Sequence, residues 1–253
     1  MKQEIRIFFT ALMFFTRIPC PKWTDHSPSY LAKSPRYFPM VGIIVGSIGA
    51  LMYYGCCFIF PPSIGLLLSM VSTVLTTGAF HEDGFADVCD GFGGGWTKEK
   101  ILIIMKDSRL GTYGVVGLVT ILSLKFTSLS AINPKLLPLV LISGHSISRY
   151  AATTLLYTHE YVRTDEQSKA GSAAQKLSTI SIIVATIFGL APLTLFFNYY
   201  VFLTLIPVFA MRWYLANFFV KWIGGHTGDC AGATQQLCEV TFYLSLLILW
   251  KFI

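Results

Sequence analysis

The stretch from Gly78 to Gly114 reads GAFHEDGFADVCDGFGGGWTKEKILIIMKDSRLGTYG and interrupts an otherwise apolar chain with a cluster of charge. It holds six of the thirteen acidic residues of the sequence, which are Glu82, Asp83, Asp87, Asp90, Glu99 and Asp107. Apolar segments flank it, Ser63–Phe80 on one side and Thr112–Ile132 on the other. Carboxylates gathered between two apolar helices predict a metal and phosphate site at a membrane surface.

The composition of the whole chain points to the lipid bilayer as its solvent. Of the 253 residues, 54% are hydrophobic and only 13% are charged, whereas a soluble domain carries about 25% charged residues. Several apolar runs approach the ~20 residues that a helix needs to cross a hydrocarbon core. We therefore expect an all-α, polytopic integral membrane protein, and no repeat or linker divides residues 1–253 into more than one transmembrane catalytic domain.

Seven apolar segments are predicted to be transmembrane helices. They are Phe38–Phe60, Ser63–Phe80, Thr112–Ile132, Leu136–Tyr157, Leu177–Phe197, Tyr199–Val220 and a last segment from Gly232 to Ile253. The run Ile5–Phe15 is shorter and is followed by Arg17, so we interpret it as an interfacial or re-entrant N-terminal helix.

The net charge of +6 is interpreted by membrane side rather than as a sign of nucleic-acid binding. In the seven-span layout the charged loops all fall on one side, including the polar loop His159–Lys176, and the positive-inside rule makes that side cytoplasmic. The bilayer is thus the expected macromolecular partner, and a homo-oligomer is compatible with the sequence. The six cysteines form no CxxC pair, as expected for small apolar residues in a reducing compartment.

Asp83, Asp87 and Asp90 are the candidate metal ligands. Their spacings of four and three residues place them on one face of a helix, because each residue turns the chain by ~100°. Carboxylates so close together repel one another unless a cation lies among them, and oxygen-only ligation suits Mg²⁺ or Mn²⁺. A solvated acidic helix end is the alternative interpretation.

Two further motifs follow within the same stretch. Glycine runs let backbone N–H groups converge on a phosphate, which makes candidate contacts of Gly93, Gly94 and Gly95, although a flexible loop has the same composition. Lys106 and Arg109 can neutralise a phosphate, and Asp107 can be a further ligand or a general base. The alternative for the two cations is contact with lipid headgroups.

The last polar loop, GHTGDCAGA from Gly225, supplies a third group of candidates: His226, Asp229 and, ten residues beyond Asp229, Glu239. Glu239 lies about 10 Å into the last predicted helix at ~1.5 Å per residue, and a carboxylate at that depth is a functional candidate. Asp229 is the second candidate proton acceptor. We expect Asp229 and Glu239 to complete the acidic site, while His226 has local capping as its alternative role.

Cations also lie inside the apolar segments. Arg149 and Arg212 are each about 12 Å from the cytoplasmic end of their helix, and His145 shares a helix face with Arg149. We expect the two arginines to line one cavity and bind an anionic substrate, with snorkelling towards the interface as the alternative. Lys125 lies nearer the outer end and is predicted to snorkel.

Four blocks together resemble the cobalamin synthase family, the adenosylcobinamide-GDP ribazoletransferases. They are FPMVG from Phe38, HEDGFADVCDGFGGG from His81, IMKDSRLGTYG from Ile104, and GHTGDCAGA from Gly225 with Glu239. The blocks are specific in combination, and none of them is specific alone. The resemblance implies the last joining step of the nucleotide loop of vitamin B12: adenosylcobinamide-GDP reacts with α-ribazole or its 5′-phosphate to give adenosylcobalamin or its phosphate and GMP. It also implies Mg²⁺ dependence and a place in the cell inner membrane.

Two alternatives stay open beside this resemblance. The DG-x-AD pattern echoes the motif of CDP-alcohol phosphotransferases, but Asp87 stands at the arginine position of that motif and the later aspartates are spaced differently. A small-solute transporter would also carry charged residues within the membrane. Transporters, however, place their coupling sites near the midplane between repeats, and this sequence shows no repeat.

Overall fold

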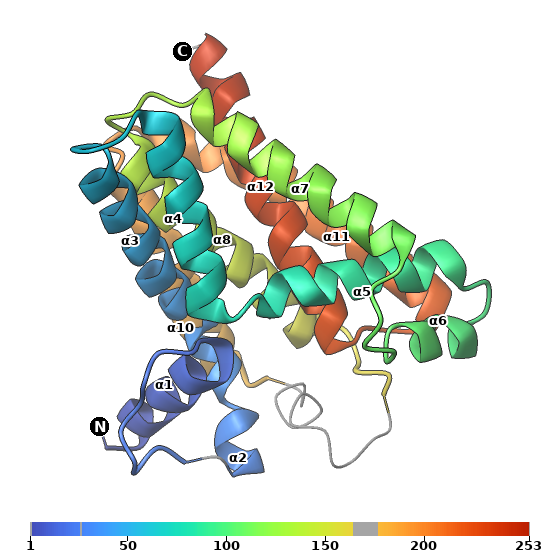
Figure 1. Ribbon diagram of the computed structural model, residues 1–253. Helices are drawn as coiled ribbons and strands as arrows, with labels where there is room; N and C mark the ends of the chain where they lie inside the picture. Colours follow the sequence, from blue (N-terminus) through green and yellow to red (C-terminus); the bar gives the residue numbers. More distant parts are fainter. Residues whose placement is uncertain (1, 26, 164–176, 253) are drawn as a thin grey trace.

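Each of the seven apolar segments forms a helix close to its expected bounds in the computed structural model, which describes residues 2–25, 27–163 and 177–252 (Figure 1). The elements in chain order are α1 (Lys2–Phe15), α2 (Pro28–Leu31), η1 (Ser34–Tyr37), α3 (Phe38–Cys56), α4 (Pro62–Thr77), α5 (Phe80–Gly94), α6 (Lys98–Ile104), α7 (Thr112–Ser130), α8 (Leu137–Thr158), α10 (Thr179–Thr194), η2 (Tyr199–Thr204), α11 (Leu205–Ile223) and α12 (Gly228–Phe252). The all-α class is confirmed. Most of the predicted loop His159–Lys176 lies outside the described residues.

The long helices form a bundle, and the polar elements gather at one end of it. α3 packs between α4 and α8, and α12 packs against α8, α7 and α11. α5 and α6 run across the lower end of the bundle in Figure 1, at the same end as α1 and α2. The polar stretch identified in the sequence therefore lies at the end of the bundle where the N-terminal helix is found.

Three helical segments among the described residues are long and apolar enough to cross a membrane alone: Ser34–Cys56, Thr112–Ser130 and Tyr199–Ile223. The bent pair α4–α5 makes a fourth if it is counted as one span, and α10 is a shorter apolar helix. α8 and α12 have 22 and 25 residues, enough for a ~30 Å core, but they carry polar side chains that the bundle buries. The chain is a polytopic membrane protein, and seven crossings stay a prediction.

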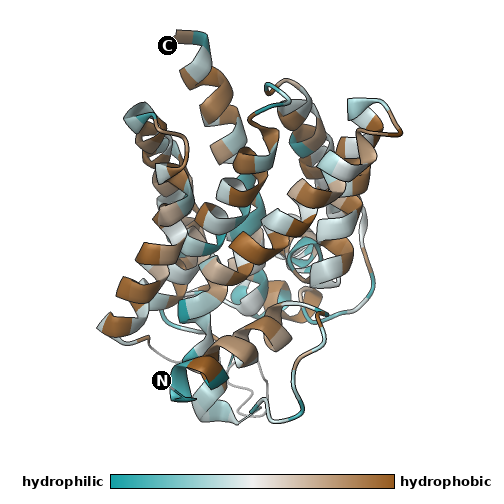
Figure 2. Cartoon of the chain, turned by 90° about the vertical axis from the view of Figure 1, so that its left-hand side faces the viewer, coloured by the Kyte–Doolittle hydropathy of each residue, from teal (hydrophilic) through white to brown (hydrophobic). Residues whose placement is uncertain are grey.

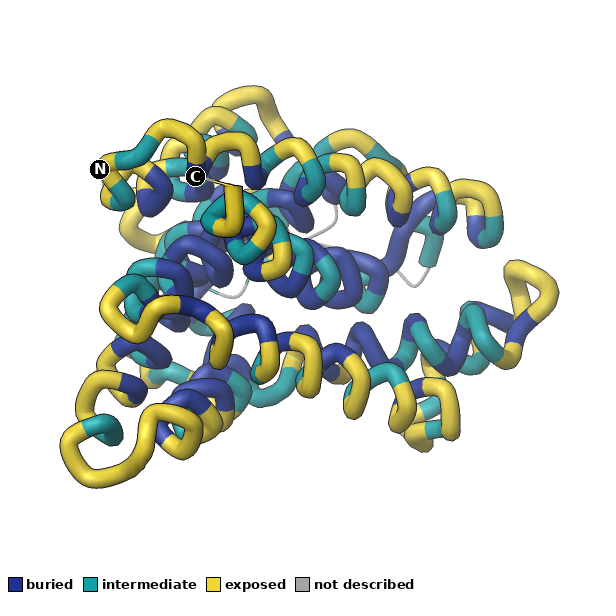
Figure 3. Tube along the Cα trace, turned by 90° about the horizontal axis from the view of Figure 1, so that it is seen from above, coloured by how far each residue is buried: buried dark blue, intermediate teal, exposed yellow. Residues whose placement is uncertain are grey.

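The distribution of polarity is that of a protein in lipid. Large apolar side chains are exposed along the outer faces of the helices, for example Leu75 on α4 and Ile187 on α10. Figure 2 shows hydrophilic residues in the middle of the bundle, and Figure 3 shows exposed residues along its outer edges. The buried polar set includes Lys125, Arg149 and Glu239. Polar groups inside a membrane bundle face one another rather than lipid.

Glycines of α3 bring its backbone against α8. A Cβ atom on Gly42 would lie 2.3 Å from the carbonyl oxygen of His145, and one on Gly46 would lie 2.7 Å from Cα of Ile142. Small residues four apart let two helix backbones approach this closely. The van der Waals contacts that result help to hold membrane helices together.

The chain turns sharply between α4 and α5. Gly78 ends α4 with φ +66°, Ala79 follows with φ +58°, and the axes of the two helices differ by 87°. Arg17 occupies the space where a Cβ on Gly78 would lie, and its N–H donates to the carbonyl of Thr76 at 2.7 Å. Because of this turn, α5 leaves the direction of the span and carries the acidic residues across the end of the bundle.

The packing of α3 predicts opposite effects for one substitution at two glycines of that helix. Gly46→Ala should lower the free energy of unfolding by about 1–3 kcal/mol, since the added methyl overpacks the contact with α8. Gly55→Ala should be neutral or stabilising, because nothing lies within 4 Å of its Cβ position and alanine favours a helix by ~1 kcal/mol. Unfolding of both variants in detergent measures this. Equal effects would contradict the close α3–α8 contact.

Candidate active site

The candidate site is built where α12 crosses α5. A Cβ on Gly84 would lie 3.0 Å from Cα of Asp229, and one on Gly232 would lie 3.3 Å from the carbonyl oxygen of His81. Glycine on both helices lets the two backbones nearly touch at this point. The first turn of α12 is thereby held beside the first turns of α5, so residues almost 150 positions apart in the sequence become neighbours.

Asp229 interacts electrostatically with two of the three predicted metal ligands at this crossing. Asp83 is exposed, Asp87 is half-buried and Asp229 is partly buried; we call these three residues the acidic group. Burial, together with the negative charges of Asp229 and Asp83, raises the pKa of Asp87 to about 7. Burial also raises the pKa of Asp229, although the Arg163 guanidinium opposes this. The shifts show that carboxylates from α5 and α12 share one electrostatic environment.

Arg163 is the cation that the structure places at the acidic group. Its Nη2 lies 2.8 Å from Oδ2 of Asp229. Two backbone hydrogen bonds set its position, because the N–H of His226 donates to the carbonyl of Glu160 and the N–H of Val162 donates to the carbonyl of His226. His226 is fully buried, and its two backbone hydrogen bonds hold the segment that ends at Arg163.

The acidic group concentrates oxygen ligands without forming a finished metal site. Within the described part of the chain, no three His, Cys, Asp or Glu side chains are close enough together to hold a metal ion. Arg163 supplies positive charge to Asp229 in the arrangement seen here. The assignment of Asp83, Asp87 and Asp90 as metal ligands therefore stays a prediction.

Asp90 ties the loop after α6 to α5. Its Oδ2 accepts a hydrogen bond from the N–H of Gly111 at 2.7 Å, and its Oδ1 accepts one from the N–H of Gly114 at 2.8 Å. A Cβ on either glycine would lie within 2.5 Å of this carboxylate, which explains why both positions are glycine. The carboxylate also caps the positive end of α7.

The residues Lys106, Asp107 and Arg109 stand on the loop that Asp90 anchors. The guanidinium of Arg109 lies 2.6 Å from Oδ2 of Asp107, and these side chains are 88% and 37% exposed. Their hydrogen bonds lower the pKa of Asp107 to about 2. Asp107 is thus a weak proton acceptor in this arrangement, and Arg109 is accessible from the aqueous side.

The glycine run has a packing role. Gly93 and Gly94 form the end of helix α5 and Gly95 caps it. A Cβ on Gly93 would lie 2.6 Å from the ring of Tyr113, and one on Gly95 would lie 2.7 Å from Ile101. Gly94 is exposed and has room for a side chain. Contact of these glycines with a phosphate stays a prediction.

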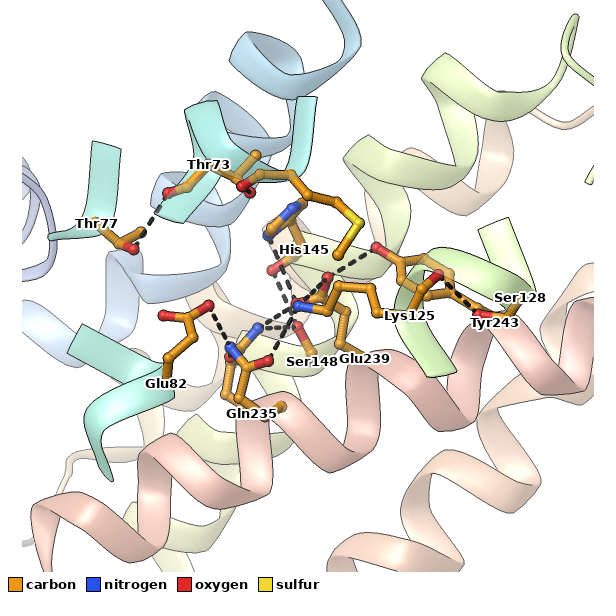
Figure 4. Close-up of polar contacts among 12 residues, drawn as sticks. Thr73, Thr77, Glu82, Lys125, Ser128, His145, Ser148, Gln235, Glu239 and Tyr243 are labelled. Atoms are coloured by element: carbon orange, nitrogen blue, oxygen red, sulfur yellow. Dashed lines mark hydrogen bonds and ion pairs between the residues drawn. The ribbon is translucent and has the colours of Figure 1, made fainter. Parts of the chain in front are cut away.

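Glu239 belongs to a buried network inside the bundle rather than to the acidic group (Figure 4). Its Oε1 lies 3.1 Å from Nζ of Lys125 and accepts a hydrogen bond from the hydroxyl of Tyr243 at 2.9 Å. Its Oε2 accepts from Gln235 and lies 3.7 Å from Nδ1 of His145. The prediction that Lys125 snorkels is wrong, because Glu239 neutralises its charge inside the bundle.

The same network reaches α5 through Gln236. The amide of Gln236 accepts from Lys125 Nζ at 3.0 Å and donates to Oε1 of Glu82 at 2.9 Å. Glu82 precedes Asp83, so a chain of polar contacts runs from the middle of the bundle to the first turn of α5. Glu239 therefore supports the site from beneath.

The two membrane arginines lie on different helices, Arg149 on α8 and Arg212 on α11, and both bind groups of α8. Arg149 is 1% exposed and its Nη1 lies 3.0 Å from Nδ1 of His145. Arg212 on α11 donates to the carbonyl of Thr154 at 2.7 Å and also contacts the hydroxyl of Thr158. Arg212 thus donates hydrogen bonds to oxygen atoms in the last turn of α8, where backbone carbonyls lack helical partners. These contacts do not bring Arg149 and Arg212 together in the common cavity that the sequence predicted. Binding of an anion by Arg149 stays a prediction.

Comparison with known proteins fits this arrangement. The family model described as cobalamin-5-phosphate synthase matches residues 7–247. The chain belongs to the cobalamin-5-phosphate synthase family. Relatives named adenosylcobinamide-GDP ribazoletransferase occur in Shewanella frigidimarina (strain NCIMB 400), 44% identical over 97% of this chain and 95% of that protein, and in Shewanella pealeana (strain ATCC 700345 / ANG-SQ1), 44% identical over 98% of this chain and 97% of that protein. No solved structure matches the chain.

Three contacts of this family member were missed by reasoning from its sequence. Arg163, Gln236 and Lys125 each pair with an acidic or amide side chain on another element. Arg163 lies two residues from the β-bridge that joins Tyr161 to His226, and nothing in the spacing of the sequence indicated that bridge. Charge balance could have paired Lys125 with Glu239, since both lie in apolar segments.

The Asp90 contacts predict that Asp90→Ala frees the loop before α7. Each hydrogen bond to the carboxylate contributes about 1.5–3 kcal/mol, so amide hydrogens at Gly111 and Gly114 should exchange faster. Hydrogen exchange of peptides covering residues 106–116 measures this, with Glu99→Ala, an exposed acid of the same stretch, as control. Unchanged exchange in Asp90→Ala would show that the carboxylate does not hold the loop.

The buried pair predicts coupling between Lys125 and Glu239. Lys125→Met should destabilise the bundle by about 3–5 kcal/mol, because it leaves a buried carboxylate without its cation. Glu239→Gln should destabilise the bundle by a similar amount, because it leaves the buried Lys125 ammonium without its carboxylate. The double variant should be more stable than the sum of the two losses implies, and a double-mutant cycle on unfolding in detergent measures that coupling. Strictly additive losses would exclude the pair.

Proposed function

We propose that this chain transfers the adenosylcobinamide phosphate group of adenosylcobinamide-GDP to α-ribazole or its 5′-phosphate and releases GMP. The products are adenosylcobalamin or its phosphate, in the last joining step of the nucleotide loop. Membership of the cobalamin-5-phosphate synthase family supports this reaction. The observation that carries it in the structure is the meeting of Asp83 and Asp87 with Asp229 and Arg163 at one end of an apolar bundle.

The reaction balances as a phosphoryl-group transfer. A ribose hydroxyl oxygen of the ribazole forms a bond to the phosphorus next to cobinamide, and the bond from that phosphorus to the oxygen shared with GMP breaks. The electron pair leaves with GMP, and the hydroxyl proton passes to a carboxylate. Such transfers depend on positioning and on neutralising phosphate charge more than on covalent catalysis.

Asp229 is the better of the two candidate proton acceptors. Its pKa is raised by burial, and a base with a raised pKa holds a transferred proton more readily at neutral pH. Asp107 is held ionised by Arg109, which makes it a weaker base. Asp107 and Arg109 together suit a different role, since an exposed guanidinium on an anchored loop can bind phosphate oxygens. Lys106 on the same loop can add a second positive charge.

The donor chemistry of the site fits Mg²⁺. Asp83, Asp87 and Asp90 offer hard oxygen ligands, and the crowding that raises the pKa of Asp87 is the kind that a divalent cation relieves. Asp90 accepts one backbone N–H on each oxygen, so each oxygen retains a lone pair. When bound, the ion would neutralise diphosphate charge. The exposed position of Asp83 and the half-buried position of Asp87 leave both side chains accessible to substrate.

We place the protein in the cell inner membrane with the acidic group facing the cytoplasm. The apolar outer faces of the helices support contact with a lipid bilayer, and the excess of lysine and arginine in loops on the predicted side supports the orientation. The substrates are water-soluble through their nucleotide and phosphate parts, which agrees with a site at the polar end of the bundle.

The proposed reaction predicts that wild-type protein in liposomes releases GMP from adenosylcobinamide-GDP when α-ribazole and Mg²⁺ are present. Asp83→Asn should lower the rate of GMP release by about 100-fold or more, because removal of one group that stabilises charge in the transition state has an effect of this size. Chelation of Mg²⁺ should abolish the activity. Glu99→Gln, which changes an exposed carboxylate on α6, is the matched control and should keep the wild-type rate.

Two outcomes separate the parts of this proposal. Absence of cobalamin formation by the wild type would overturn the assigned reaction. Wild-type rates in Asp83→Asn would leave the reaction standing and would overturn the role of that carboxylate.

A further inference from the structure

A cavity walled by aromatic rings opens at the same end of the bundle as the acidic group. Four of its lining residues are phenylalanines from three separate helices, and a histidine and small residues complete it. The lining is Phe14, Phe15, Pro35, Phe38, Phe80, His81, Leu156, Gly228, Ala231 and Gly232. His81 and Gly232 take part in the α5–α12 crossing through their backbones, but the proposed chemistry uses none of the lining side chains.

His81 gives this cavity one polar group without a partner. The side chain is 2% exposed, and its Nε2 has no hydrogen-bond partner among the described residues. Its ring stacks on Phe38 at 5.4 Å between ring centres and 14° between planes, and Phe38 stacks on Phe15 at 4.1 Å. A buried ring nitrogen left without a hydrogen-bond partner destabilises the empty cavity, so the site favours a ligand that supplies the missing hydrogen bond.

The cavity and the acidic group both adjoin the α5–α12 crossing. His81 and Gly232 line the cavity and pack against each other at the crossing. Asp229 follows the lining residue Gly228 directly, and Asp83 lies two residues after His81. A ligand held in the cavity therefore has its exposed end close to the residues that would perform the transfer.

We propose that this cavity binds the planar aromatic base of the ribazole acceptor, with Nε2 of His81 hydrogen-bonded to a ring nitrogen of the base. The inference rests on the proposed function, which supplies an acceptor with a flat, apolar, nitrogen-containing ring. Stacking on aromatic side chains stabilises bound bases of any sequence, because every base has a flat face. The attached ribose then extends towards Asp229.

The lining distinguishes this ligand from the other groups that reach the site. A nucleoside diphosphate would need cations around it, and the lining residues include no lysine or arginine. A lipid chain would leave the His81 nitrogen unpaired. An aromatic heterocycle can stack on the phenylalanine rings and can also form the hydrogen bond that Nε2 of His81 lacks.

The test measures binding of radiolabelled α-ribazole to purified protein in phospholipid nanodiscs, without the second substrate. Ala231→Leu fills the cavity and Phe14→Leu removes one ring while keeping its apolar character. Ala191→Leu makes the same change as the first variant at an exposed position of α10 and is the matched control. Steady-state kinetics of the same proteins give the KM for each substrate separately, and thermal midpoints establish that the variants fold.

We expect Ala231→Leu to weaken α-ribazole binding about tenfold or more, which corresponds to about 1.4 kcal/mol, and Phe14→Leu to weaken it by a smaller factor. His81→Ala should raise the KM for α-ribazole and leave the KM for adenosylcobinamide-GDP unchanged. Ala191→Leu should bind as the wild type does.

Unchanged α-ribazole affinity in folded Ala231→Leu would overturn the inference, as would a rise confined to the KM for adenosylcobinamide-GDP. Loss of bound phospholipid from Ala231→Leu with unchanged α-ribazole affinity would identify a lipid site instead. If the wild type forms product while all variants bind α-ribazole normally, the inference alone fails. If the wild type binds α-ribazole through this cavity but forms no product, the proposed reaction fails and the binding site stands.

Discussion

The contact between the backbones of α5 and α12 at Gly84 and Gly232 is the constraint on which the site depends. α5 contributes Asp83 and Asp87, and α12 contributes Asp229, but neither helix alone gathers the charge. A Cβ atom at either glycine would lie only 3.0–3.3 Å from the backbone of the other helix, so the two helices would have to move apart. The acidic group and the aromatic cavity both adjoin this contact, so both depend on one close approach.

A second constraint lies beneath the first, inside the bundle. Lys125 and Glu239 are both buried, so each charge requires the other. Gln236 connects this pair to Glu82 on α5, which gives the first turn of α5 a fixed support. α5 also buries Phe85 and Val88 in the apolar core, and the polar contacts to α12 add to that packing.

Much of the fold could be predicted from the sequence, because the length and composition of an apolar segment are enough to predict a membrane helix. The bounds of α3, α7 and α8 agree with prediction to within a few residues. The site was less predictable, since helical spacing shows which residues share a face but not what that face contacts. Asp83 and Asp87 share a face as expected, whereas the partner of Lys125 is more than 110 residues away along the chain. Asp90 looked like a third equivalent ligand, yet it also holds two backbone N–H groups of a distant loop.

The most direct test of this account is the affinity for Mn²⁺, measured by electron paramagnetic resonance on protein in nanodiscs, because Mn²⁺ takes the same oxygen ligands as Mg²⁺. If the crossing assembles the acidic group, Gly84→Ala should weaken Mn²⁺ binding although it removes no ligand, since its Cβ would press on Asp229 at 3.0 Å. Asp87→Asn should weaken binding as well. A folded Gly84→Ala variant that binds Mn²⁺ as tightly as the wild type would contradict the central claim.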